Sequence, residues 1–490
     1  MIIETLSTFP GMYDSVMNSS MMRIAQEKGI LDFHAYDLRD WTHDRHRTTD
    51  DDPYGGGAGL VMKCEPLFEA YDEICSSGEG RDFGSCPERA DRAASTKRVP
   101  HEPEVPSGTS ARAGLPSDWA PPDPPAAPQP VYDLSTGSVD TALFPARSWG
   151  RIQKELLYQR PELLQRGEMQ GDAPLRTQIA EYLSVYRGVE CTPEQIVVGA
   201  GIEYLLGCLA HLFSDGMAAI ENPGYFRTRT VLQNSGIPCT LVDIDREGLP
   251  ADALEKSGAN LCYLTPSHHF PTGVTMPATR RAQLLAWAAA RPGRYILEDD
   301  YDSEFRFDTR PLPSLQGMAG PDGPVVYLTT FSKSLAPGIR IACMVLPQSL
   351  LARYRRDFAT YANTVSRFEQ QTLCEFMAGG YFTRHLARMR LAYKRRMEAF
   401  AAALRAALPG VELDGVHSGL HFLLTLPGAG GERAMVAAAA QQGVRLRGLS
   451  EYYLARPELC RADTVVAGYS ALKEDDVEKV AQALARAWLS

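Results

Sequence analysis

The sequence predicts an α/β protein built around a large, mostly parallel sheet, followed by a smaller C-terminal α/β domain. Two observations lead to this fold class. From about residue 131 onward, short β-rich runs alternate with helical runs, a pattern that favours crossover connections onto a parallel sheet. Before that point, a proline-rich stretch separates this pattern from an unrelated N-terminal piece of partial α/β character.

The N-terminal piece covers residues 1–75 and has the pattern of half a small α/β domain. We expect a strand over 2–8, a helix over 13–28 and a second strand over 31–38. Residues 76–130 hold eleven of the 34 prolines and few large apolar side chains. Such a segment buries too little surface to offset its ordering entropy, so we predict a linker there.

Residues 131–370 form the predicted large domain, and residues 371–490 form the predicted small domain. Ligands of parallel sheets bind beyond the carboxyl ends of the strands, so polar residues just after each strand are the candidate site. The strands expected in the large domain are 195–198, 217–220, 240–244, 260–264, 294–297 and 325–329, and the helices are 203–213, 226–234, 279–290 and 350–361. The small domain is expected to contain a helix over 381–407 and mixed segments over 420–426 and 464–469.

Composition excludes several classes of protein for this chain of 490 residues. Its formal net charge of -10 argues against binding nucleic acid by bulk electrostatics. The ten cysteines include no CxxC pair and no cluster with metal-ligand spacing, so we expect no metal and a reducing, cytoplasmic location. The sequence shows neither a signal-peptide pattern nor an apolar run long enough for a membrane span, so we expect no membrane partner.

Two predicted strand ends carry groups suited to binding an anion and a cation. Gly199, Ala200 and Gly201 form a turn that opens the helix expected over 203–213, where free backbone N–H groups suit a phosphate. Glycines in such turns are more often structural. The apolar run that ends at Leu297 continues directly into Glu298, Asp299 and Asp300, although a strand leaving the core for solvent would look the same.

Two further positions supply an amine and a guanidinium. Lys333 lies in a Ser-Lys-Ser sequence just after the strand expected over 325–329, which makes it a candidate for a Schiff base, although most lysines are exposed and inert. Arg340 follows a Pro-Gly turn and could return as a phosphate clamp. Tyr225 offers an aromatic face, or else it is a core tyrosine. Together these groups meet the needs of pyridoxal phosphate, which requires a lysine, a carboxylate, an anion cup and a flat apolar contact.

Three long motifs carry a family resemblance: PSHHFPTG at 266–273, EDDYDSEFRF at 298–307 and TFSKSLAPGIR at 330–340. With these motifs, residues 131–490 resemble the class I/II aminotransferases, which are fold type I pyridoxal-phosphate enzymes, and in particular the aminotransferase-type domain of MocR regulators. The resemblance implies that Lys333 forms a Schiff base with the cofactor and later shuttles a proton. It further implies that Asp299 pairs with the pyridinium nitrogen, Tyr301 bonds the ring hydroxyl oxygen and Tyr225 stacks on the ring. The residues implied to hold the phosphate are Gly201, Ile202, Thr330, Ser332 and Arg340.

The sequence departs from that family at the substrate end. Aminotransferases usually carry an arginine near a C-terminal strand that grips the substrate carboxylate, but residues 464–469 read TVVAGY. Without a bidentate clamp, efficient transamination of ordinary α-amino acids is not expected. Arg227 is a candidate substitute anchor, and a surface arginine is the equal alternative. The segment at 166–171, which in the family reaches across a dimer, is also altered.

Residues 1–75 resemble a different family, the knotted tRNA guanine N-1 methyltransferases. The resemblance rests on Thr8-Phe9-Pro10, on YDLRD at 36–40, on HRT at 46–48 with the acids at 50–52, and on PYGGGAGLVMK at 53–63. In that family the knot that binds S-adenosylmethionine, with the catalytic acid, lies further along the chain, where this sequence has its proline-rich segment. We therefore expect no methyl transfer by this chain alone, and contact with tRNA only through residues 1–75.

The leading prediction is a pyridoxal-phosphate-dependent aminotransferase that acts on an amino acid or amine and forms a homodimer. One alternative is a ligand sensor, a regulator-derived module that binds the cofactor and an amine with little turnover. The other alternative is a tRNA guanine-N1 methyltransferase that acts through the N-terminal segment. MocR regulators carry a winged helix-turn-helix before the aminotransferase part, and we find no such pattern here and expect no DNA binding.

Overall fold

The computed structural model describes residues 2–18, 20–44, 47–51, 61–62, 66, 69–70, 74, 132–307 and 312–489. The chain divides into two compact units, residues 1–120 and residues 121–490. The predicted linker at 76–130 and most of the glycine-rich run at 53–63 lie outside the described residues.

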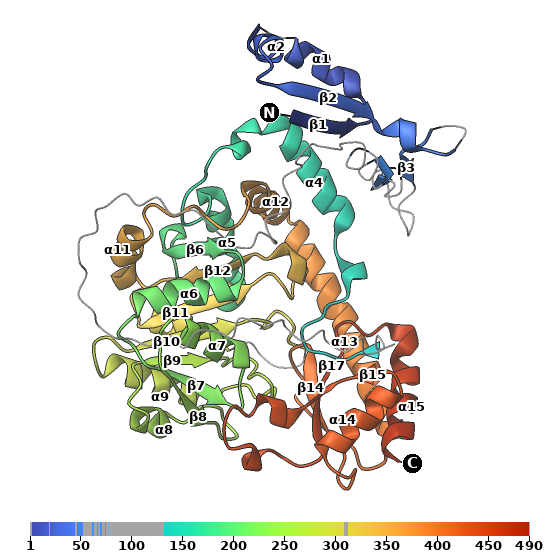
Figure 1. The fold of residues 1–490 in the computed structure, drawn as a ribbon. Helices are drawn as coiled ribbons and strands as arrows, with labels where there is room; N and C mark the ends of the chain where they lie inside the picture. Colours follow the sequence, from blue (N-terminus) through green and yellow to red (C-terminus); the bar gives the residue numbers. More distant parts are fainter. Residues whose placement is uncertain are drawn as a thin grey trace, which may run out of the picture. The chain divides into compact units, whose positions relative to one another are not determined.

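The first unit contains a small parallel sheet of two strands, β1 (Ile2–Ser7) and β2 (Asp32–Asp37) (Figure 1). The single helix expected over 13–28 is divided into α1 (Asp14–Met17) and α2 (Ser20–Glu27). The first helix ends before Asn18, a residue type whose side chain competes for backbone hydrogen bonds and favours helix ends. A short antiparallel pair, β3 (Asp50–Asp51) with β4 (Val61–Met62), completes the described part.

The second unit is built on a seven-stranded sheet with the order β6-β12-β11-β10-β9-β7-β8 (Figure 1). All neighbouring strands are parallel except β12, which runs antiparallel to both β11 and β6. The mostly parallel sheet predicted from the strand and helix alternation is therefore confirmed. The strands are β6 (Ile196–Gly199), β7 (Ala218–Asn222), β8 (Cys239–Asp243), β9 (Leu261–Leu264), β10 (Tyr295–Asp300), β11 (Val325–Thr330) and β12 (Ala342–Val345).

Helices cover both faces of this sheet because successive strand residues point to opposite faces. Val197 packs with the leucines of α6 on one face, whereas Ile196 and Val198 pack on the other face with α4, α5 and α12. Both faces are thus apolar, which explains the continuous hydrophobic runs of the strands. The helices are α4 (Ala146–Gln159), α5 (Ala173–Arg187), α6 (Ile202–Leu212), α7 (Phe226–Asn234), α8 (Ala251–Lys256), α9 (Ala278–Ala289), α10 (Leu315–Ala319), α11 (Gln348–Asp357) and α12 (Arg367–Ala378).

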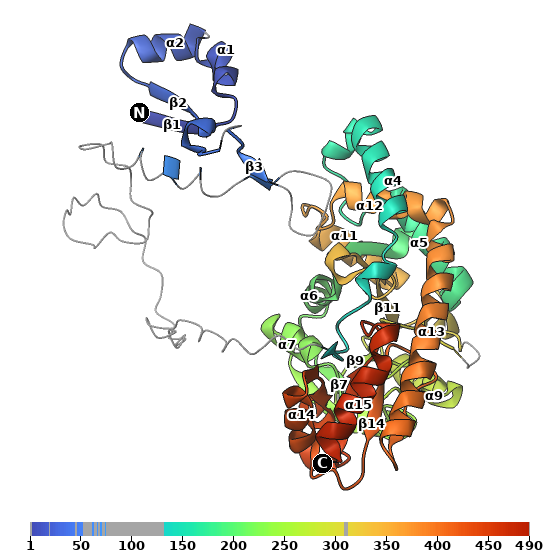
Figure 2. The ribbon, with the colours of Figure 1, turned by 90° about the vertical axis from the view of Figure 1, so that its right-hand side faces the viewer.

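The C-terminal part has its own antiparallel sheet, in the order β13-β14-β17-β16. The long helix α13 (Tyr381–Ala407) runs beside α15 (Val477–Trp488) and encloses a separate hydrophobic core with this sheet (Figure 2). The pair formed by β5 (Tyr132–Asp133) and β15 (Val444–Arg445) joins the start of the unit to this part. The remaining elements are β13 (Glu412–Asp414), β14 (His421–Thr425), α14 (Glu432–Gln441), β16 (Arg447–Gly448) and β17 (Thr464–Gly468).

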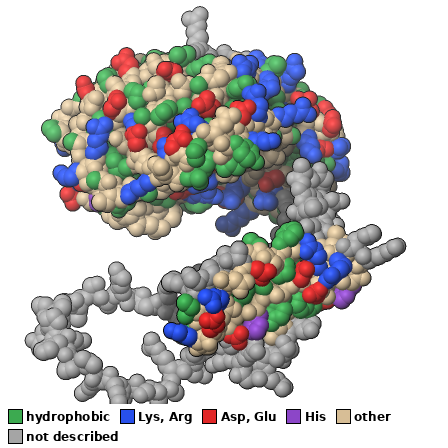
Figure 3. All heavy atoms as spheres, turned by 90° about the horizontal axis from the view of Figure 1, so that it is seen from above, with side chains coloured by type: hydrophobic (Ala, Val, Ile, Leu, Met, Phe, Trp, Pro, Cys, Tyr) green, Lys and Arg blue, Asp and Glu red, His purple; other side chains and the backbone are tan. Residues whose placement is uncertain are grey.

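The described surface carries charges of both signs. On the face of residues 132–489 that Figure 3 shows, Lys and Arg side chains are interspersed with Asp and Glu side chains. Within the described ranges, no helix combines the length and the apolar character needed to cross a bilayer.

Candidate functional site

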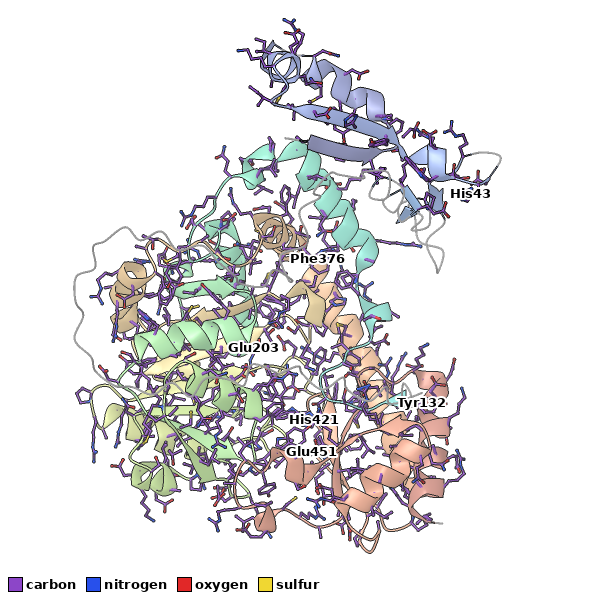
Figure 4. All side chains as sticks on the ribbon, viewed as in Figure 1. His43, Tyr132, Glu203, Phe376, His421 and Glu451 are labelled. Atoms are coloured by element: carbon purple, nitrogen blue, oxygen red, sulfur yellow. The ribbon has the colours of Figure 1, made fainter. Side chains whose placement is uncertain are left out.

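A cavity of about 210 Å³ opens at the carboxyl ends of β7, β9, β10 and β11. All ten residues predicted from the sequence line it: Gly201, Ile202, Tyr225, Arg227, Asp299, Tyr301, Thr330, Ser332, Lys333 and Arg340. The C-terminal part of this unit supplies a further wall through Leu420 and His421. Figure 4 shows Glu203, from α6, and His421, from β14, where the two parts of this unit meet. The site therefore lies where ligands of parallel sheets are expected.

One end of the cavity has the properties of an anion cup. Gly201 caps α6 with a φ of 94°, and a Cβ atom at this position would collide with the guanidinium of Arg340. Arg340 Nη2 donates to the carbonyl oxygen of Ala200 at 3.3 Å and to Glu203 Oε2 at 3.0 Å. Glycine is thus required both for the backbone conformation and for the close approach of the arginine. The N–H groups of the first turn of α6, Ile202 included, add the positive end of the helix dipole.

Two hydroxyl groups stand at the end of β11. Thr330 Oγ1 and Ser332 Oγ lie 2.8 Å apart, and the Ser332 N–H donates to Thr330 Oγ1 at 3.2 Å. Both side chains line the same cavity as Arg340. Backbone N–H groups, hydroxyls and a guanidinium are the donors that a phosphate group requires, and this end of the cavity supplies all three.

Asp299 lies on β10 and is buried. Its Oδ2 accepts a hydrogen bond from the hydroxyl of Tyr263, while its Oδ1 is buried and meets no hydrogen-bond partner within the described ranges. Burial raises the pKa of this carboxyl to about 7. A buried carboxylate oxygen without a partner is costly, so Oδ1 fits a ligand that brings an N–H donor, such as a pyridinium ring.

Lys333 follows β11, and its Nζ donates to the carbonyl oxygen of Thr136 at 2.5 Å. Burial lowers the pKa of this amine to about 8, and the nearby Asp302 carboxylate opposes the shift. An amine with a lowered pKa is neutral in a larger fraction of molecules near neutral pH. Lys333 therefore has the properties of a nucleophilic lysine rather than of a surface ion.

Aromatic side chains form the apolar wall of the cavity. Phe270 meets Tyr225 edge to face with ring centroids 5.5 Å apart, and meets Tyr301 in the same way at 6.1 Å. The Tyr301 hydroxyl lies 3.0 Å from His268 Nδ1. Burial raises the pKa of both tyrosines, so their phenols stay protonated. This wall can contact a flat ring and offers one hydroxyl at its edge.

A buried polar group lies behind Tyr301. His268 Nδ1 is 2.9 Å from Asp302 Oδ2, and the rings of His268 and His421 are 4.7 Å apart. In the part of the chain that the structure describes, His268, Asp302 and His421 are the one group whose metal-ligating atoms gather, within 4.8 Å of one another. His268 Nδ1 faces both Asp302 oxygens and His421 Nε2 lies 3.1 Å from the Pro271 carbonyl oxygen, while His268 Nε2 is buried without a partner among the described residues.

The segment that lacks the arginine usual in aminotransferases, residues 464–469, includes strand β17. The position where an arginine clamp was sought lies on β17, and there Val466 is buried in an apolar cluster with Phe270 and Tyr452. Arg227 lines the cavity and lies 3.9 Å from Glu203 Oε1, with about three fifths of its side chain exposed. Phe270 of this cluster lines the cavity, no residue of β17 does, and the lining includes the partly exposed Arg227.

Sequence reasoning missed several cavity residues. Tyr263 could have been found from strand register, because it pairs with Leu297 and so shares a face with Asp299 two residues further along β10. His268 and Asp302 lay within the quoted motifs without an assigned role. Nothing in the sequence indicated that Thr136 and His421 line the cavity, because both are far along the chain from the strand ends of the large sheet.

Comparisons with known proteins define the class of this chain. Residues 129–484 match the family described as aminotransferase class I and II, so the chain belongs to that family. Its fold is that of the fold type I pyridoxal-phosphate aminotransferases, and pyridoxal phosphate is its cofactor. The residues around the cavity fit this group, since Asp299 Oδ1 is buried without a described donor and Gly201 lets the Arg340 guanidinium approach the first turn of α6. Residues 1–85 match the family described as tRNA (guanine-1)-methyltransferase.

Particular relatives include both regulators and enzymes. The chain is 39% identical to the uncharacterized HTH-type transcriptional regulator YhdI of Bacillus subtilis, over 73% of this chain and 76% of the relative. It is 30% identical to the probable rhizopine catabolism regulatory protein MocR of Rhizobium meliloti, over 86% and 84%. Among solved structures, the kynurenine aminotransferase of Pyrococcus horikoshii matches with a TM-score of 0.63 at 25% identity, over 73% of this chain and 90% of that one. The α-aminoadipate aminotransferase LysN of Thermus thermophilus, complexed with N-(5'-phosphopyridoxyl)-L-leucine, matches with a TM-score of 0.63 at 26% identity, over 73% and 92%.

Proposed function

We propose that this protein is an aminotransferase-type enzyme that holds pyridoxal phosphate covalently through Lys333 and acts on an amino acid or amine. The observation that carries the proposal is the convergence of the Lys333 amine, the Asp299 carboxylate and the Arg340 guanidinium on one cavity. Asp299 lies at the end of β10, whereas Lys333 and Arg340 follow β11, the neighbouring strand. Each supplies one of the contacts that this cofactor needs, and no single one of them would be specific.

Each residue has a physical role in this proposal. When bound, the cofactor supplies an aldehyde for amines and a protonated ring that withdraws electrons from the carbon next to the amine. Asp299 Oδ1 accepts the ring N–H, and the ionised carboxylate keeps that nitrogen protonated. Tyr225 contacts the ring face, and the Tyr301 hydroxyl bonds the ring oxygen. Gly201, Ile202, Thr330, Ser332 and Arg340 hold the phosphate.

Lys333 has a second task in the same scheme. Its lowered pKa lets the amine take a proton from the substrate carbon at one stage and return it at another, without leaving the cavity. Thr136 fixes the direction of the amine through its carbonyl oxygen. Arg227 is the proposed contact for an anionic group of the substrate, in place of the arginine that β17 lacks.

The test is the absorbance of the purified protein after addition of pyridoxal phosphate. The wild type should develop a yellow band that moves when an amino acid or amine is added. Lys333→Ala should bind the cofactor without that band, whereas the exposed Lys256→Ala should behave as the wild type does. A wild type that stays colourless in excess cofactor would overturn the proposal.

A second candidate function is that of an effector domain that binds the cofactor and an amine with little turnover. Two observations favour it: Val466 leaves β17 without a carboxylate clamp, and several relatives are named as HTH-type transcriptional regulators. An enzyme should pass the amino group to the cofactor and release a carbonyl product. An effector domain should change its spectrum on binding and then stop, which a stopped-flow record with product analysis distinguishes.

The proposal includes an assembly, a location and a division of the chain. Exposed apolar side chains on and after α4, namely Leu157, Tyr158 and Leu164, support a homodimer, which sedimentation would test. All cysteines of the described residues are unpaired, which supports a reducing cytoplasm. We divide the chain into a methyltransferase-like segment over 1–75, a linker over 76–130, a large domain over 131–370 and a small domain over 371–490.

A further inference from the structure

Glu203 places a carboxylate of the protein's own in the cavity, close to the proposed phosphate cup. It lies in the first turn of α6, two residues after Gly201, and lines the same cavity as Arg340. Its Oε2 accepts from Arg340 Nη2 at 3.0 Å, and its Oε1 lies 3.9 Å from Arg227 Nη1. One carboxylate thus bridges the proposed phosphate clamp and the proposed substrate anchor (Glu203 is labelled in Figure 4).

The contacts of Glu203 indicate that it is ionised. Partial burial raises the pKa of this carboxyl, but hydrogen bonds from its own backbone N–H and from Arg340 outweigh the burial and leave the pKa below its ordinary value. An ionised carboxylate has two oxygen acceptors, as a phosphate has three. Glu203 therefore offers Arg340 the same kind of charge-assisted hydrogen bond that a phosphate would offer.

The same contacts have a cost for a bound phosphate. A phosphate in the cup would take hydrogen bonds from Arg340 and from the N–H groups of α6, and it would meet the Glu203 charge at short range. Like charges close to each other repel, and the part of the Arg340 interaction that Glu203 already holds must be given up. Arg227 provides the place to which the Glu203 carboxylate can turn, because it is already within 3.9 Å.

We propose that Glu203 is an internal competitor for the cofactor's phosphate group, one that occupies Arg340 until the phosphate displaces it toward Arg227. This inference rests on the proposed function, since it requires that Arg340 binds the phosphate. Its consequence is that the cavity holds the phosphorylated cofactor less tightly than the same cup would without Glu203. A second consequence is that the released carboxylate neutralises Arg227, so a bound phosphate weakens the attraction of this anchor for anionic ligands.

The test measures phosphate recognition apart from any covalent bond to Lys333. Pyridoxamine 5'-phosphate and pyridoxamine have no aldehyde, and they differ only in the phosphate. Calorimetric titration of the full chain with both compounds therefore isolates the phosphate contribution. We expect Glu203→Gln to bind pyridoxamine 5'-phosphate about three- to tenfold more tightly than the wild type, up to the size of one charge-assisted hydrogen bond. Binding of pyridoxamine should change less than twofold.

The chain offers a closely matched control in Glu255. This carboxylate also bridges two arginines, at 2.8 Å from Arg291 and 2.7 Å from Arg294, and its side chain is 44% exposed against 39% for Glu203. It is not part of the cavity lining. Glu255→Gln removes the same charge and should leave both affinities unchanged. Glu203→Ala serves as a second variant and should tighten binding of the phosphorylated compound in the same direction as Glu203→Gln.

The outcomes separate this inference from the proposed function. If the wild type binds pyridoxamine 5'-phosphate no more tightly than pyridoxamine, the phosphate cup itself is wrong and the proposed function fails with it. If the wild type prefers the phosphorylated compound but Glu203→Gln leaves that preference equal or smaller, only the competitor role of Glu203 is overturned. The competitor role is also overturned if Glu203→Gln raises the affinities for both compounds equally, or if Glu255→Gln has the same effect. In either case the loss of negative charge would raise the affinity by a route other than direct competition with the phosphate for Arg340.

Discussion

At the scale of single residues, burial shifts the pKa values of ionisable groups that line the cavity. Burial lowers the pKa of the Lys333 amine to about 8 and raises the pKa of the Asp299 carboxyl to about 7. Both shifts favour the neutral form, as expected for groups removed from water. A bound pyridinium ring would reverse the shift at Asp299, because its positive charge favours the carboxylate.

The shift at Lys333 predicts a pH profile. Only the neutral amine attacks an aldehyde, so the rate at which pyridoxal phosphate reacts should rise about tenfold per pH unit below the midpoint and level off above pH 8. Stopped-flow absorbance between pH 6 and pH 10 measures it. Since Asp302 opposes the lowering, Asp302→Asn should move the midpoint to lower pH. A midpoint near the ordinary lysine value of 10.5 in the wild type would contradict this account.

Gly201 provides a second prediction at this scale. Gly201→Ala adds a Cβ that collides with Arg340 and forces an alanine into a positive φ. We expect the affinity for pyridoxal phosphate to fall about tenfold or more, with a smaller effect on pyridoxal, which has no phosphate. Gly207→Ala is the matched control on the same helix, since a Cβ there would meet no described atom within 4 Å. Equal losses for the two compounds would show that the cup is not at Gly201.

At the scale of elements, β10 shows how one strand serves both the fold and the site. Glu298, Asp299 and Asp300 are all buried, and each faces a different partner. Glu298 accepts the N–H groups of Leu315 and Gln316 at the start of α10, whereas Asp300 forms a buried ion pair with Arg187. Asp299 and Asp300 each retain an Oδ1 without a described partner, but of the three acids only Asp299 lines the cavity. Two of the three acids therefore stabilise the fold, and the middle one is available for a ligand.

This division predicts a stability difference at β10. Asp300→Ala would leave the Arg187 guanidinium buried without its carboxylate and remove the acceptor of the Tyr327 hydroxyl at 2.5 Å. We expect the free energy of unfolding to fall by about 3–5 kcal/mol in denaturant titrations. Asp252→Ala, which breaks an exposed pair with Lys256, should change it by less than about 1 kcal/mol. Similar losses in the two variants would contradict the structural role of Asp300.

The sequence predicted those elements whose pattern is local. The helices over 226–234 and 381–407 match α7 and α13, since each has a continuous helical pattern with clear ends. Strand β12 was missed, because four apolar residues after a turn do not distinguish a strand from other buried segments. In the site, residues at strand ends could be predicted together because parallel strands share an edge. Thr136 could not, since its contact with Lys333 joins positions 197 residues apart.

At the scale of the whole molecule, the two compact units carry different chemistry. Every residue that lines the cavity belongs to the second unit, and none comes from residues 1–120 among those described. The first unit has a two-stranded parallel sheet, and residues 1–85 match a tRNA methyltransferase family. Cofactor binding and any property of the N-terminal segment should therefore be separable.

Removal of residues 1–120 tests this separation. We expect the shortened chain to bind pyridoxal phosphate with an affinity within about twofold of the full chain, because no described cavity contact is lost. Absorbance titration of both proteins measures it. We also expect the full chain to transfer no methyl group from labelled S-adenosylmethionine to tRNA. Loss of cofactor binding on truncation, or methyl incorporation by the full chain, would show that the segment contributes more than we infer.

The attachment point of the cofactor is the most direct test of the account. Protein loaded with pyridoxal phosphate is treated with borohydride, which fixes an imine to the lysine that carries it, and is then digested and mapped by mass spectrometry. We expect one stoichiometric phosphopyridoxyl adduct, on the peptide that contains Lys333. An adduct spread over exposed lysines, or located at a single lysine elsewhere, would contradict it.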